Sequence, residues 1–63
     1  MIVMYQLTDR GKQLSHSMGD NSPEWRTIHY LARQHVATRD VLYSIGDAGV
    51  VAKLATKGII EKA

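Results

Sequence analysis

The chain has 63 residues, with eight Lys and Arg against six Asp and Glu, three His and no Cys. This length predicts a single domain, 1–63, that buries only roughly 60% of the surface its unfolded form exposes, so we expect marginal stability. The lack of cysteine excludes disulfides and thiolate metal sites. The three histidines have no metal-binding spacing, so we expect no metal and no other cofactor.

The net charge of +2 is unevenly distributed along the chain. Residues 1–32 carry equal numbers of basic and acidic side chains, whereas 33–63 carry five basic and three acidic ones. An excess of basic residues in one half is compatible with contact to phosphate groups.

The opening segment Met1–Met4 is apolar but ends at Tyr5. It is too short for the hydrophobic region of a signal peptide. No stretch approaches the ~20 apolar residues that a membrane span needs. We therefore expect no membrane association and a cytoplasmic location, which the lack of cysteine also favours.

The first expected elements are a strand over 2–7, rich in β-forming residues, and a helix that starts after Thr8. Leu14 and Met18 are four residues apart, which places them on one face of this helix. Gly11 lowers the helix propensity by up to ~1 kcal/mol relative to Ala, unless a neighbour packs against its bare backbone.

The clearest helix start lies at 22–24, where Ser precedes Pro and Glu. Serine is a preferred N-cap, proline suits the first helical position, and the helix dipole stabilises glutamate in the first turn. The following apolar residues recur at helical spacing and predict a helix with one face in the core. These residues are Trp25, Ile28, Leu31 and Ala32.

Two further helices are expected on either side of Gly46. Thr38 caps the first one and Asp47 caps the second, which runs over 47–57. A short strand over 59–62 follows. A glycine-containing turn this short makes two helices meet at a steep angle, as in a helix-turn-helix. The residues of the last helix expected to face the core are Val50, Val51, Leu54 and Ala55.

Three stretches of the chain resemble the winged-helix family of transcription regulators. The stretch YLARQHVATRDVLYSIG resembles the part of that family in which a helix ends, a short loop follows, and a threonine-capped second helix closes at glycine. The stretch VVAKLATKGIIEKA resembles the end of the family's recognition helix where it leads into the first wing strand. The stretch YQLTDRGKQL resembles the family's wing-closing strand and the helix that follows that strand. In the family this segment usually comes after the recognition helix, whereas here it precedes the helices.

The resemblance implies an α+β, mainly α fold: a winged-helix-like three-helix core with a helix-turn-helix. A small two-stranded sheet would form from the terminal strands, with 2–7 pairing with 59–62. Such a domain would bind double-stranded DNA as a dimer and act in transcriptional regulation, with the helix over 47–57 approaching the major groove.

The expected DNA contacts are few. Lys53 and Thr56 would lie nearest the bases, two alanines could contact thymine methyl groups, and the other basic residues would hold phosphates. The helix lacks the Arg, Asn and Gln that make bidentate base contacts, so sequence readout would be limited. The candidate nucleic-acid-binding residues are Arg39, Ala48, Ala52, Lys53, Thr56, Lys57 and Lys62.

The sequence also bears on two functions other than DNA binding. A protein-interaction or dimerisation module is the alternative, because the helix over 47–57 exposes alanine and glycine that suit close packing against another protein, and fold does not settle function. Catalysis is not expected: His35, Asp40 and Ser44 could form a triad on paper, but no nucleophile elbow or oxyanion glycine accompanies them.

Overall fold

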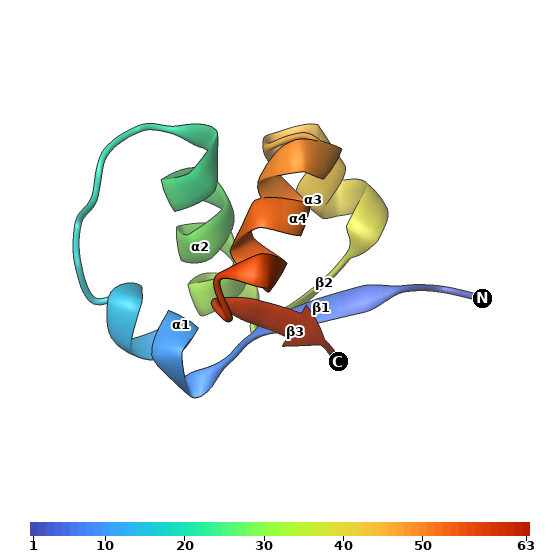
Figure 1. Cartoon of the computed structure of the whole chain (residues 1–63), viewed down its shortest axis with the longest axis horizontal. Helices are drawn as coiled ribbons and strands as arrows, with labels where there is room; N and C mark the ends of the chain where they lie inside the picture. The colour runs from blue at the N-terminus through green and yellow to red at the C-terminus, as the bar shows by residue number, and fades with distance from the viewer.

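The computed structural model describes all residues, 1–63, as four helices and three short strands (Figure 1). The predicted α+β, mainly α fold is confirmed. In chain order the elements are β1 (Met4–Leu7), α1 (Asp9–Leu14), α2 (Pro23–Gln34), β2 (Val36–Thr38), α3 (Arg39–Ile45), α4 (Ala48–Thr56) and β3 (Ile60–Lys62). None of the helices has the length and apolar character that crossing a membrane requires.

The sheet is antiparallel, with the strand order β2-β1-β3. The expected pairing of the terminal strands is confirmed, since Tyr5 lies opposite Lys62 and Leu7 opposite Ile60. The third strand, β2, was not predicted. Its three residues read as a connection between helices, and only pairing with β1, more than thirty residues earlier in the chain, makes them a strand. Both chain ends lie at the same end of the sheet (Figure 1).

All four helices begin where a side chain caps them, as the sequence predicts. In each case the side chain accepts a hydrogen bond from the backbone N–H three residues later, which satisfies one of the free donors of the first turn. The caps are Thr8, Ser22, Thr38 and Asp47.

The predicted break between the last two helices is also confirmed, because α3 ends at Ile45 and α4 begins at Ala48. Gly46 is buried at this corner, where its backbone lies close to α2. A Cβ added at Gly46 would lie 3.1 Å from Thr27 Oγ1 and 3.0 Å from Val50 Cγ1. A Cβ here would press on both side chains, so glycine favours close packing of the corner. The backbone conformation itself does not require glycine, because a φ of −131° is open to any residue.

Gly11 has the same role at the other end of the molecule. It is buried in α1, and a Cβ there would collide with the carbonyl oxygen of Ile59. Thr8 strengthens this junction, since its N–H donates to Ile59 O at 3.0 Å and its hydroxyl donates to Gly58 O. The segment that leads into β3 is thus the neighbour that packs against the bare backbone of Gly11 and offsets its low helix propensity.

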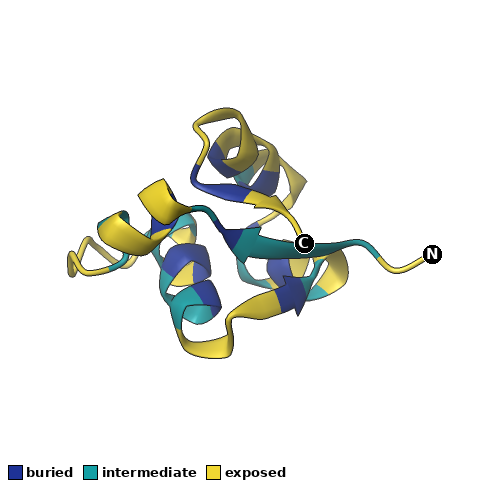
Figure 2. Cartoon of the chain, turned by 90° about the horizontal axis from the view of Figure 1, so that it is seen from below, coloured by how far each residue is buried: buried dark blue, intermediate teal, exposed yellow.

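The core lies between the helices and the sheet (Figure 2). Four of the eight expected core residues of α2 and α4 are buried, and three others are partly buried at the edge of the core: Trp25, Ala32 and Val50. Two expectations were wrong. Ala55 is exposed, and Met18 is 89% exposed because α1 already ends at Leu14. The buried apolar residues are Leu7, Ile28, Leu31, Ala37, Leu42, Val51, Leu54, Ile59 and Ile60.

Candidate nucleic-acid interface

One side of α4 faces solvent along its whole length. Its opposite side carries Val51 and Leu54, which are buried in the core and fix the orientation of the helix. The small residues on the free side allow another surface to approach the helix backbone closely. All five candidate residues of this helix are exposed, as expected: Ala48, Ala52, Lys53, Thr56 and Lys57.

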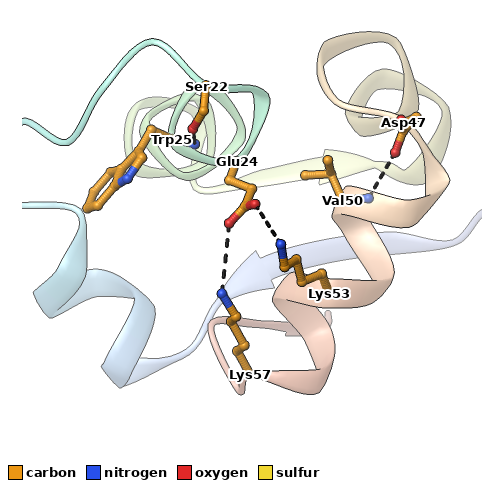
Figure 3. A network of polar contacts seen from close by, with 7 residues as sticks. All are labelled: Ser22, Glu24, Trp25, Asp47, Val50, Lys53 and Lys57. Atoms are coloured by element: carbon orange, nitrogen blue, oxygen red, sulfur yellow. Dashed lines mark hydrogen bonds and ion pairs between the residues drawn. The ribbon is translucent and has the colours of Figure 1, made fainter.

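Lys53 in α4 and Lys57, the residue that caps its C-terminus, share one carboxylate on α2 and are called here the two lysines of α4 (Figure 3). Lys53 Nζ lies 3.1 Å from Glu24 Oε1, and Lys57 Nζ lies 3.9 Å from Glu24 Oε2. The two lysine side chains are 55% and 50% exposed, so they remain accessible to a ligand. A phosphate that binds them must compete with Glu24.

Glu24 reaches both lysines because of its position at the start of α2. Ser22 caps this helix, and its Oγ accepts from the N–H of Trp25 at 3.4 Å. A carboxylate in the first turn is favoured by the helix dipole. Trp25, the next residue, points away from α4 (Figure 3).

The role of Glu24 was missed by the sequence reasoning. The spacing of Lys53 and Lys57 shows that they share a face of α4. It does not show which acidic residue packs beside that face, because Glu24 is 29 residues from Lys53 in the chain.

Arg39 and Lys62 form a separate group at the end of the sheet where β1 starts. The N–H of Arg39 donates to Val3 O at 2.8 Å, and Lys62 lies opposite Tyr5. Arg39 follows β2 and Lys62 is the last residue of β3. Because these are the two outer strands and neighbouring strands lie about 5 Å apart, the two backbones are separated by roughly 10 Å. The Arg39 guanidinium lies 5.8 Å from the centre of the Tyr43 ring. No ion pair or hydrogen bond connects these two residues to the lysines of α4.

A second basic surface, which the sequence analysis did not propose, lies on α2. It is an open groove with a volume of about 610 Å³ between α2, the segment before it and the end of α3. Arg26 and Arg33 are seven residues apart, a spacing that places them on one face of the helix and that could have identified the surface. The lining residues are Met18, Asp20, Asn21, Arg26, His29, Tyr30, Arg33, Ser44 and Ile45.

Asp20 is the only acidic residue of this α2 groove. Its carboxylate accepts a hydrogen bond from the N–H of Ser22 at 2.8 Å. Hydrogen bonding to Ser22 lowers the pKa of Asp20 below its usual value of 3.8. Neither Arg26 nor Arg33 forms an ion pair with it or with any other carboxylate.

The residues considered for a catalytic triad are not joined. The Ser44 hydroxyl donates to Val41 O at 2.7 Å within its own helix. Ser44 lines the α2 groove, whereas His35 lines a different groove of about 950 Å³ beside α1, in which basic and acidic side chains are mixed. No hydrogen bond joins Ser44, His35 and Asp40.

The chain matches none of the protein-family models, curated proteins or solved structures compared with it. The class of protein that the structure defines is a small α+β domain with four helices packed on a three-stranded sheet.

Proposed function

We propose that the chain is a winged-helix-like domain that binds double-stranded DNA through α4 and acts in transcriptional regulation, with two copies bound side by side. One observation carries the proposal. The corner at Gly46 packs against α2 and leaves the entire outer side of α4 free, with small residues along it and two lysines at its edge. Such a helix is suited to entering a major groove.

The strand pairing supports the winged-helix resemblance. In that family the wing-closing strand usually follows the recognition helix. Here the similar segment precedes all the helices, and it nevertheless pairs with the strand that follows α4. The order of the strands and helices along the chain differs from that of the family, but the two strands that the resemblance expects to pair are neighbours in the sheet.

The ion pairs of Glu24 are compatible with DNA binding. Exposed ion pairs contribute about 0.2–1 kcal/mol, so phosphates can displace the carboxylate at low cost. Contacts from Lys53, Lys57, Arg39 and Lys62 would neutralise up to four phosphates. The logarithm of the binding constant should then fall with the logarithm of the salt concentration with a slope of roughly −3 to −4. Binding this weak favours a second copy or a linked module.

The proposal is tested by a double substitution in α4. Lys53→Gln/Lys57→Gln should strongly weaken a salt-sensitive mobility shift on mixed-sequence duplex DNA. Arg10→Gln/Lys12→Gln on α1 removes the same charge elsewhere and serves as the matched control, which should retain most of the shift. Circular dichroism checks that both variants keep their helices. If the unchanged protein gives no shift at low salt, DNA binding is ruled out.

Protein binding is the second candidate, and exposed apolar side chains favour it. Ile2 is 76% exposed, and Val36, on the outer strand β2, is 39% exposed. An outer strand with unpaired backbone groups can add a strand from another chain. Sedimentation equilibrium of the pure protein tests self-association. A monomer at all concentrations would remove the dimer from both candidates.

A further inference from the structure

The α2 groove faces away from α4. Successive residues of an α-helix are turned by about 100°. Arg26 and Arg33 therefore lie roughly 200° and 180° around the helix from Glu24. Since Glu24 contacts both lysines of α4, the two arginines are on the side of α2 opposite to α4. A ligand in the groove and a ligand on α4 would occupy different faces of the domain.

The positive charges of the groove are available. Arg26 and Arg33 form no ion pair, so an anion can bind them without displacing a carboxylate. Asp20, the only acidic side chain of the groove, is held by the N–H of Ser22. The lysines of α4 differ in this respect, because both contact Glu24.

The other side chains of the groove suit a nucleotide chain. Guanidinium groups bind phosphate through two hydrogen bonds in a planar geometry. Tyr30 and His29 lie between the arginines and offer aromatic rings to a base or sugar. The His29 ring is fixed, because Nε2 lies 2.9 Å from Ser17 O and the ring centre lies 5.5 Å from that of Trp25.

The spacing of the arginines indicates a ligand with more than one phosphate. Seven residues of helix separate the Arg26 and Arg33 backbones by roughly 10 Å, so each side chain can contact a separate phosphate. A chain of phosphodiesters offers such a series of anionic groups.

We propose that the α2 groove binds the phosphodiester backbone of nucleic acid, so that the domain has a second nucleic-acid-binding face opposite α4. This inference rests on nucleic acid being the partner, as in the proposed function, but it does not require that α4 contacts it. A domain with both faces can hold two duplexes together.

The test compares three double variants with equal loss of charge: Arg26→Gln/Arg33→Gln, Lys53→Gln/Lys57→Gln and the control Arg10→Gln/Lys12→Gln. Each is titrated with a short DNA duplex at several salt concentrations while the backbone amide signals are followed by NMR. We expect the arginine variant to lose the binding that shifts the amide signals of residues 26–33, which in the unchanged protein should have a salt slope of about −2 from two phosphate contacts. In the unchanged protein, and in the lysine variant, the duplex should shift the amide signals of residues 26–33.

Bridging provides a second measurement. Two duplexes that carry a donor and an acceptor dye should show energy transfer when the unchanged protein is added. The arginine variant should lose this transfer. Transfer that survives in this variant means that two copies bridge DNA through α4 alone, which overturns the second face.

The remaining outcomes separate the two proposals. If the arginine variant binds as the control does and the signals of 26–33 stay in place, the groove proposal is overturned while DNA binding by α4 stands. If only the arginine variant loses binding, α4 is not the interface and the groove is. If poly-glutamate of equal charge shifts 26–33 as strongly as DNA, the groove takes acidic protein segments, and the nucleic-acid assignment is overturned. No binding of DNA by any of the proteins overturns both proposals.

Discussion

The outer side of α4 and the α2 groove each carry two basic side chains, but the charges are held differently. Lys53 and Lys57 share the carboxylate of Glu24, whereas Arg26 and Arg33 have no ion-pair partner. The number of basic residues on a surface is therefore a poor measure of the charge it offers to a ligand. What matters is which acidic side chain the fold places beside them.

The first turns of α2 explain this difference. Glu24 lies on the side of α2 that packs beside α4, and Arg26 lies on the opposite side, two residues later. One helix thus reduces the available charge of one surface and supplies that of the other. Three predictions test how far the two surfaces are independent.

The largest expected effect comes from Leu54→Ala, which should abolish both surfaces together. Leu54 is fully buried at 0% exposure, and a buried Leu→Ala change costs about 2–5 kcal/mol. The free energy of unfolding for a domain of this size is only roughly 3–9 kcal/mol, at about 0.05–0.15 kcal/mol per residue. Urea unfolding followed by circular dichroism measures the loss.

Leu14→Ala is the matched control for this prediction. Leu14 is only partly buried, at the end of α1, so the same substitution should cost clearly less. If Leu54→Ala were as mild as Leu14→Ala, α4 would not be anchored in the core as the structure describes it.

A smaller effect is expected from Glu24→Gln, which should strengthen DNA binding through α4. The substitution frees both lysines from the carboxylate they share and should raise the affinity severalfold at low salt, because an exposed pair contributes up to about 1 kcal/mol. Binding in the α2 groove should stay unchanged. Fluorescence anisotropy with a labelled duplex measures the affinity.

Glu61→Gln controls for the change in net charge. Glu61 accepts a hydrogen bond from Gln6 Nε2 at 3.0 Å and contacts neither lysine of α4. An equal gain of affinity from both substitutions would show that only the overall charge matters and that Glu24 does not mask the lysines.

The smallest expected effect concerns Asp20 and pH. Its pKa is lowered in the folded protein by hydrogen bonding to Ser22, so the charged carboxylate favours the folded state. This contribution is present above the unfolded pKa of about 3.8 and is lost as the pH falls through the lower folded value. Asp20→Asn should remove this part of the acid dependence, so that the variant is less stable than the unchanged chain near neutral pH and about equally stable at low pH. Thermal unfolding between pH 2 and 7 measures it, and identical acid profiles would contradict the prediction.

Much of the fold could be predicted from short segments of the sequence. The four caps follow from side chains that accept hydrogen bonds from backbone groups three residues away, and the break at Gly46 follows from the residues next to it. The pairing of the terminal strands was predicted too, but from the resemblance to winged helices. The length of α1 was overestimated, since an apolar spacing continued to Met18 although the helix did not.

The candidate site was predicted only in part. The exposure of Lys53 and Lys57 follows from the helical period of α4. Their partner does not, because an ion pair depends on which helices pack together. The α2 groove likewise needs the segment before α2 and the end of α3 beside Arg26 and Arg33.

The sequence by itself determined where the helices start and which of their faces are apolar, because capping and periodicity act over a few residues. Only the tertiary structure decided that β2 is a strand, that Gly11 and Gly46 are packing positions, and that Glu24 pairs with Lys53 and Lys57. Each of these depends on contacts between residues far apart in the chain, and such contacts exist only once the core has formed.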